Sequence, residues 1–203
     1  AMSSIVYLNG EYLPRSEAKL AVDERGFFFG DGVYEVTRAV DGRLFESGRH
    51  MKRLARGLRE LRLDPPLSLD EIETVSLELL KRNDITSGEG TVYLQITRGA
   101  APRTHHFPPP GTPCTVFLSA QRFSLPTEKR ANGVAVVTYP DIRWSRCDLK
   151  AVALLPNVLT RQLAADAGCA ETIMIRNGYL TEGSSTNVFV VKNGVILTPP
   201  QDN

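Results

Sequence analysis

Four Asn-Gly or Asp-Gly dipeptides constrain the fold of this chain more than any other feature. They stand at residues 9–10, 41–42, 177–178 and 193–194, between runs rich in β-branched or aromatic residues. Both central residues of a type I′ turn need a positive φ, which Asn, Asp and Gly tolerate, so each dipeptide predicts a tight β-hairpin. The expected strands span residues 5–8, 11–13, 33–40, 43–46, 91–98, 114–121, 133–140, 171–176, 186–191 and 195–198.

The first of three expected helices covers residues 47–63. Its apolar residues recur at the spacing that places them on one helix face, while the rest of the segment is rich in Arg and Lys. The apolar residues are Met51, Leu54, Leu58 and Leu61. We expect Ser47 to cap the start of this helix, because a serine hydroxyl can accept a hydrogen bond from a free backbone N–H group.

Two further helices carry signals at one of their ends. In the second, residues 68–83, Ser68 is followed three positions later by Glu71, which is the pattern of a capping box. The third, residues 154–168, ends at Gly168. Glycine tolerates the left-handed conformation that commonly follows the last helical turn, so the third helix is expected to end there.

The composition becomes polar at residues 124–133, SLPTEKRANG, which predicts a domain boundary. We expect an N-terminal α+β domain over residues 1–123 and a strand-rich second domain over residues 124–203, which carries Lys150. The chain stops with VILTPPQDN, directly after an expected strand, and its second domain is small for so many strands. We therefore expect the C-terminal part of the protein to be missing from this chain.

Composition argues against several classes of protein. The 203 residues carry a formal net charge of +1, which indicates neither nucleic acid nor an anionic membrane as a partner. The apolar runs are too short to cross a bilayer, and the first residues lack the pattern of a secretory signal. Cys114, Cys147 and Cys169 lack metal-ligand spacing, so we expect no metal site and reduced thiols in a cytoplasmic protein.

Lys150 stands between a polar segment rich in arginine and the apolar run AVALL. Burying an ammonium group costs several kcal/mol unless the group is paired or neutralised, so few lysines lie inside a protein. A lysine that is held away from water can act as a nucleophile. On local sequence alone, however, the better interpretation is a side chain that packs its stem and keeps its amine in water.

Two loops contain small residues that could bind an anion. Glu182 precedes a Gly-Ser-Ser-Thr-Asn run, in which Ser184 and Ser185 offer backbone and hydroxyl donors. In FFFGDGVYEV, two glycines flank Asp31 before a strand that carries Tyr34. An ordinary β-turn and an ordinary strand entry explain these two patterns equally well.

A third loop, residues 97–113, interleaves Arg and His with Pro and Gly. Its Arg103 and His105 suit the recognition of a carboxylate, because a guanidinium presents a planar fork of donors. A solvated basic loop is the alternative. Arg53, in the basic helix, has the pattern of a surface charge.

Taken in order, these stretches resemble the fold-type IV family of pyridoxal-phosphate enzymes, and within it the D-amino acid aminotransferases. The resemblance covers essentially the whole chain. It rests on ERGFFFGDGVYEV, HMKRL, TRGAAPRTHHFP, DIRWSRCDLK and TEGSSTNVF. It implies a two-domain α+β fold, with a small N-terminal α/β domain and a larger strand-rich C-terminal domain.

The resemblance implies roles for five cofactor-binding residues. Lys150 matches the lysine that holds pyridoxal 5′-phosphate as an aldimine and then acts as the general base. Glu182 matches the acid that pairs with the pyridine nitrogen, and Arg53 matches an arginine that binds the phosphate. Ser184 and Ser185 would contact the cofactor from the same turn as Glu182.

The resemblance also implies a substrate site and an assembly. Tyr34, Arg103 and His105 match residues that hold the substrate carboxylate, and the loop that carries the last two reaches into a neighbouring subunit. This implies a homodimer with composite sites that exchanges an amino group between a D-amino acid and a 2-oxo acid, such as 2-oxoglutarate or pyruvate. His106 departs from the glutamine expected there, and the second phosphate-binding loop of the family would lie beyond Asn203.

Other activities remain open at this point. Branched-chain aminotransferases, (R)-selective amine transaminases and aminodeoxychorismate lyase belong to the same family and share the lysine and the glutamate. A non-catalytic dimeric protein is an alternative of another class. A nucleotide-binding module is a third, although no Walker-type or dinucleotide glycine pattern supports it.

Overall fold

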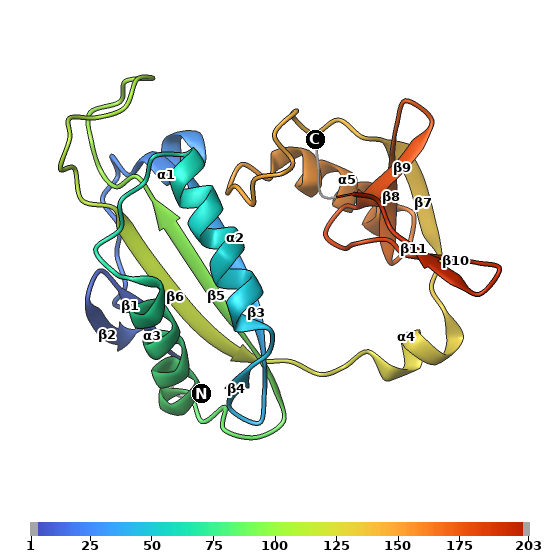
Figure 1. Cartoon of the computed structure of the whole chain (residues 1–203), viewed down its shortest axis with the longest axis horizontal. Helices are drawn as coiled ribbons and strands as arrows, with labels where there is room; N and C mark the ends of the chain where they lie inside the picture. The colour runs from blue at the N-terminus through green and yellow to red at the C-terminus, as the bar shows by residue number, and fades with distance from the viewer. Residues whose placement is uncertain (1–3, 201–203) are drawn as a thin grey trace. The chain divides into compact units, whose positions relative to one another are not determined.

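The computed structural model describes residues 4–200, which form two compact units (Figure 1). The first unit runs as far as Leu125 and also includes Leu149–Ala153. The second contains Pro126–Asp148 and continues from Leu154. The expected division differs in one respect, because the segment that carries Lys150 packs with the first unit.

An antiparallel sheet forms the centre of the first unit. Its strands are β1 (Ile5–Leu8), β2 (Glu11–Pro14), β3 (Gly32–Val40), β4 (Arg43–Leu44), β5 (Glu89–Thr97) and β6 (Thr115–Arg122). They lie in the order β2-β1-β6-β5-β3-β4, and each pair of neighbours is antiparallel. The β1–β2 and β3–β4 hairpins turn at Asn9 and Asp41, both with φ of 49°, as the dipeptide pattern predicts.

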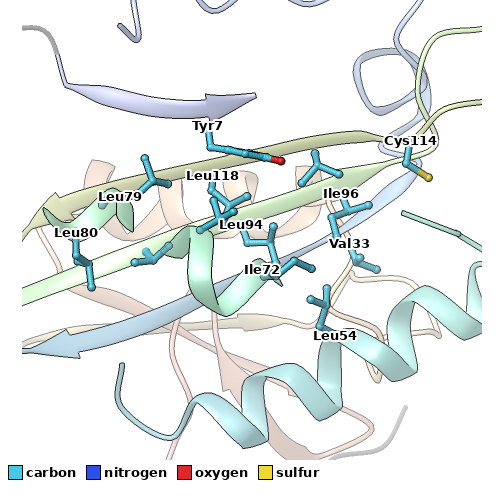
Figure 2. Packing of buried hydrophobic residues seen from close by; sticks show 14 of the residues in the cluster. Tyr7, Val33, Leu54, Ile72, Leu79, Leu80, Leu94, Ile96, Cys114 and Leu118 are labelled. Atoms are coloured by element: carbon cyan, nitrogen blue, oxygen red, sulfur yellow. The ribbon is translucent and has the colours of Figure 1, made fainter. Parts of the chain in front are cut away.

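Helices α2 (Ser47–Glu60) and α3 (Leu69–Arg82) pack against this sheet and enclose the core (Figures 1 and 2). Residues of β3 alternate, so that Val33, Glu35, Thr37 and Ala39 are buried. The largest fully buried apolar side chains of the unit are Val6, Val33, Leu54, Ile72, Leu79, Leu80, Ile96, Val116 and Leu118. The carboxylate of Glu35 therefore lies at an inward position of β3, between Val33 and Thr37, where it needs partners.

The two predicted N-terminal caps have different outcomes. The capping box of α3 is confirmed, because Glu71 N donates to Ser68 Oγ over 3.2 Å and Ser68 N donates to Glu71 Oε2 over 2.7 Å. The cap predicted at Ser47 is wrong. Glu46, with a left-handed φ of 54°, occupies that position. Ser47 is already the first helical residue, and its buried hydroxyl has no hydrogen-bond partner within residues 4–200.

The second unit contains a three-stranded sheet, a hairpin and two helices. Strands β7 (Val136–Pro140), β8 (Glu171–Arg176) and β9 (Tyr179–Gly183) lie in the order β7-β8-β9. The first pair is parallel and the second is antiparallel. Helix α5 (Leu155–Asp166) lies in the connection between the parallel strands and packs against both of them. Strands β10 (Val190–Lys192) and β11 (Val195–Leu197) form the hairpin.

The predicted end of α5 is confirmed. Gly168 has a φ of 65°, and its N–H donates to Ala165 O over 3.0 Å. Cys169 N donates to Ala164 O over 2.8 Å. This pair of bonds satisfies carbonyl groups at the helix end and is the Schellman arrangement.

Some elements of the fold differ from expectation. Two short helices, α1 (Arg25–Phe29) and α4 (Thr127–Asn132), and strand β9 were not expected. Strand β10 starts at Val190 instead of residue 186, because residues 184–186 bend and residues 187–189 have no regular structure. In the part of the chain that is described, none of the helices is both long and apolar enough to cross a membrane.

Candidate functional site

Lys150 is held by backbone pairing at the start of β3. Tyr34 N donates to Lys150 O and Val152 N donates to Gly32 O, both over 3.0 Å. These bonds lay the segment Leu149–Ala153 along the edge of β3, which β4 pairs only near its far end. Lys150 is thus fixed by residues more than a hundred positions away in the sequence.

The amine of Lys150 lies above an aromatic ring. Its Nζ is 4.2 Å from the centroid of the Tyr34 ring, which in turn stacks on Tyr93 at 5.8 Å. The side chain of Lys150 is half-buried. Within residues 4–200 no carboxylate forms an ion pair with this amine. The contact holds the amine in place. Since the amine is not committed to a carboxylate, it is available to react with a carbonyl group.

Glu35 fixes Arg53 in α2 by a two-pronged ion pair. Arg53 Nε donates to Glu35 Oε1 and Arg53 Nη2 donates to Glu35 Oε2, each over 2.6 Å. His50 Nδ1 lies 2.8 Å from Glu35 Oε2. The side chain of Glu35 is 1% exposed and that of Arg53 is 42% exposed, so one end of the pair is buried and the other faces solvent.

The pKa of Glu35 reflects this environment. Burial by itself would raise the pKa of the carboxyl, but the hydrogen bonds from Arg53 and His50 outweigh burial, so the pKa lies below its ordinary value. The same pair raises the pKa of Arg53. Arg53 is therefore a fixed cation with an exposed guanidinium, which fits an anion-binding role.

The loop of residues 99–113 brings Arg103 and His105 together around Phe29. The guanidinium carbon of Arg103 is 5.3 Å from the Phe29 ring centroid, and the His105 ring is 5.6 Å from it. Both side chains belong to exposed residues. Tyr34 lies instead beside Lys150, so the structure of one chain gives the three predicted carboxylate-binding residues in two groups.

In the second unit, Glu182 forms an ion pair with Arg143. Arg143 is itself held by Asp141, through bonds of 2.9 Å from Nε and 2.7 Å from Nη2. Thr181 Oγ1 also donates to Asp141, over 2.8 Å. The Asp141 side chain is 0% exposed. Burial would raise its pKa, but the bonds from Arg143 and Thr181 outweigh burial and hold it well below the usual range.

The turn that follows Glu182 is organised by Glu171. Ser184 donates to Glu171 Oε1 through its hydroxyl and, over 2.8 Å, through its backbone N–H, while Ser185 Oγ donates to Oε2 over 3.1 Å. Burial would raise the pKa of Glu171, but the bonds from Ser184, Thr172 and Ser185 outweigh burial and lower it. The hydroxyls predicted to contact a cofactor thus stabilise the turn itself.

Three carboxylates that organise these groups were not predicted from the sequence. Glu35 holds Arg53 and Glu171 holds Ser184 and Ser185. Asp141 holds Arg143, which is the partner of Glu182. Glu35 gives one signal in the sequence, because it occupies an inward position of an alternating strand, where an acid needs a buried partner. Arg143 and Thr172 are close in sequence to Asp141 and Glu171, but Thr181 and Ser184 lie 40 and 13 positions away, where a local pattern does not identify them.

Comparison with known proteins identifies the family. Residues 32–203 match the family model for amino-transferase class IV. A D-alanine aminotransferase from Staphylococcus haemolyticus is 41% identical over 198 residues, which are 98% of this chain and 70% of that protein. The chain belongs to the class IV aminotransferase family. A D-alanine aminotransferase from Bacillus licheniformis is likewise 41% identical, over 96% of this chain and 68% of its own length.

Solved class IV aminotransferase structures share the fold. The branched-chain amino acid aminotransferase of Escherichia coli matches with a TM-score of 0.88 at 25% identity, over 98% of this chain and 68% of that one. A pyridoxal-phosphate-bound aminotransferase from Mycobacterium tuberculosis matches with a TM-score of 0.81 at 24% identity, over 97% and 71%. The predicted fold-type IV architecture is confirmed, and this chain corresponds to about 70% of the length of the relatives it matches.

Proposed function

We propose that this class IV aminotransferase transfers an amino group between a D-amino acid and a 2-oxo acid, with pyridoxal phosphate as cofactor. The observation that carries the proposal is the half-buried Lys150, whose amine lies over Tyr34 without an anionic partner. The choice of D-amino acid is supported by the 40–41% identity to D-alanine aminotransferases over nearly the whole chain. Branched-chain enzymes of the same fold are less similar in sequence, at 24–26% identity.

In each unit, taken by itself, the candidate residues have the chemistry that the cofactor requires. Lys150 offers an amine to the aldehyde. The guanidinium of Arg53, which is paired with the buried Glu35, offers donors to the phosphate. Glu182 offers a carboxylate to the ring nitrogen, and its orientation is set by Arg143. Pyridoxal phosphate, when bound, acts as the electron sink that makes the substrate Cα–H bond acidic.

The residues of this chain then move the proton and hold the substrate. Lys150 Nζ, once released, removes the proton from the Cα atom of the amino acid, which is the task of a neutral, positioned amine. Arg103, His105 and Tyr34 hold the substrate carboxylate. Since the carboxylate position decides which Cα substituent faces Lys150, these three residues select the D-enantiomer.

The same proposal includes a homodimer in the cytoplasm. Arg103 and His105 lie on an exposed loop of the chain, separate from the Tyr34–Lys150 pair, which suits a site shared between two subunits. Cys114, Cys147 and Cys169 are free thiols, which suits a reducing compartment.

A spectroscopic experiment on the cofactor-loaded, full-length enzyme tests the activity. Lys150→Ala should abolish both the visible absorbance of the lysine-bound cofactor and transamination, whereas Lys19→Ala, at an exposed lysine, should keep both. Among D-alanine, L-leucine and (R)-1-phenylethylamine, D-alanine should change that absorbance fastest. A faster reaction with L-leucine or the amine would refute the D-amino acid assignment, and a Lys150→Ala enzyme that still turns over would refute the role of the lysine.

A further inference from the structure

Arg25, the first residue of α1, links two parts of the first unit that are far apart in the sequence. Its side chain is 3% exposed. Nε donates to Asp31 Oδ2 over 2.9 Å, and Nη1 donates to Thr104 O over 2.7 Å. Thr104 stands between Arg103 and His105. A buried guanidinium therefore holds the peptide group between the two residues proposed to bind the substrate carboxylate.

Asp31 is shared by a second arginine that fastens the start of the same loop. Arg98 Nε donates to Asp31 Oδ2 over 2.8 Å, and Nη2 donates to Oδ1 over 3.0 Å. Arg98 Nη2 also donates to Leu61 O over 2.7 Å. Burial would raise the pKa of Asp31, but the bonds from Arg98 and Arg25 outweigh it and lower the pKa, so Asp31 carries its charge at neutral pH.

Aromatic contacts join the same groups. The guanidinium carbon of Arg25 is 4.7 Å from the centroid of Phe29, the ring that Arg103 and His105 also contact. Further along the loop, Phe107 lies 3.7 Å from the guanidinium of Arg98. Backbone bonds from Arg25 N to Gly99 O, over 2.9 Å, and from Ala101 N to Asp23 O, over 3.1 Å, hold the start of the loop of residues 99–113. Further along, Arg25 holds Thr104 and Arg98 contacts Phe107, and both arginines are paired with Asp31.

We propose that Arg25 is a positioning residue for substrate binding, which fixes the backbone between Arg103 and His105 in the geometry that receives the carboxylate. This inference rests on the proposed role of those two residues. Arg25 itself is too buried to meet the substrate. A guanidinium suits the task because its separate nitrogens reach Asp31 and Thr104 at once, whereas a lysine presents one nitrogen and cannot span both.

The test compares Arg25→Lys with Arg103→Ala in the full-length holoenzyme. The lysine keeps a cation beside Asp31, which also retains Arg98, so the fold is preserved while the bond to Thr104 is lost. Loss of a hydrogen bond from a charged donor weakens an equilibrium by about tenfold or more. We therefore expect the KM for D-alanine to rise by about this factor. The kcat and the cofactor absorbance should stay within twofold of wild type. Arg103→Ala should raise the same KM.

Hydrogen exchange supplies a readout that does not depend on activity. In Arg25→Lys, backbone amides of residues 99–113 should exchange faster, while amides of β3, β5 and β6 should be unchanged. Arg15→Lys is the matched control, because Arg15 is an exposed arginine that contacts Phe117 elsewhere in the unit, and it should change neither quantity.

Three results would overturn the proposal. The first is an Arg25→Lys enzyme with an unchanged KM and unchanged loop exchange. The second is faster exchange across the whole sheet, which would mean that Arg25 supports the fold in general. The third is an Arg103→Ala enzyme with a normal KM for D-alanine. That result would refute the function of the loop itself, and it differs from a failure confined to Arg25.

Discussion

Replacing Glu35 by glutamine should destabilise the first unit and loosen Arg53. The wild-type carboxylate accepts bonds of 2.6 Å from both Arg53 Nε and Arg53 Nη2 and lies 2.8 Å from His50 Nδ1. A glutamine offers one carbonyl oxygen, and its NH₂ group would face another donor. The variant therefore loses at least the bond at one of the two oxygens, and Arg53 is no longer held by both prongs.

The magnitude follows from the burial of each partner. Hydrogen bonds to charged groups contribute about 1.5–3 kcal/mol each. Because 42% of the Arg53 side chain is exposed, water can replace part of the lost interaction. We expect a loss of about 2–4 kcal/mol, at the lower end of the cost of breaking a buried ion pair. For a chain of this size, a loss of about 2–4 kcal/mol corresponds to a fall in Tm of about 4–16 °C.

The loss of stability in Glu35→Gln should depend on pH in a defined direction. The pKa of Glu35 is lowered in the folded protein from its ordinary value of 4.5, so the carboxylate stabilises the fold fully above that pH. This stabilisation is lost as the pH falls through the lowered pKa. The difference in Tm between wild type and Glu35→Gln should therefore be largest near pH 7 and shrink below about pH 4.5.

Calorimetry at several pH values measures the effect, and titration with pyridoxal phosphate measures its consequence for Arg53. We expect weaker cofactor binding in Glu35→Gln. The control is Glu78→Gln, which removes an exposed pair with Arg82 in α3 and should cost no more than about 0.5 kcal/mol. Equal losses in the two variants, or a difference that does not change with pH, would refute the reasoning.

Further predictions concern the core, the loop and the second unit. Leu79→Ala removes a side chain that is 0% exposed and should cost about 2–5 kcal/mol in denaturant unfolding. Gly99→Ala should lower Tm by several degrees in calorimetry, because Gly99 has a φ of 86° and a Cβ there would collide with the backbone of Pro113. Glu171→Gln should cost about 1–3 kcal/mol at pH 7. The cost should fall below pH 4.5, since the pKa of Glu171 is lowered from that value.

Matched controls separate these mechanisms from general effects of substitution. Leu20→Ala, at a side chain that is 55% exposed, should change stability little. Gly111→Ala introduces a side chain at a φ of 84° with no atom within 4 Å, so it carries backbone strain without the collision. Glu128→Gln, at an exposed residue, should change stability little at pH 7. Equal effects in a variant and its control would contradict the corresponding prediction.

Local sequence determined most of the secondary structure. The hairpin dipeptides, the one-sided apolar pattern of α2 and the capping box of α3 depend on residues a few positions apart, and the structure has all three. The prediction that Ser47 caps α2 was wrong because a cap depends on which residue is the first helical one, and that position shifted by one. Strand β9 was missed because its five residues, YLTEG, lack an alternating pattern. The family resemblance also came from the sequence, since ordered motifs over the whole chain are specific.

Tertiary structure decided how the candidate residues are held. Lys150 is held by pairing with β3, Arg53 by a carboxylate inside the sheet, and Thr104 by Arg25, 79 positions away. Ion pairs and buried hydrogen bonds of this kind depend on distance and burial, which a local pattern does not encode. The sequence by itself therefore determined the elements, the family and the candidate residues. Only the folded chain determined which carboxylates fix those residues, because partners far apart in sequence meet only when the sheets have formed.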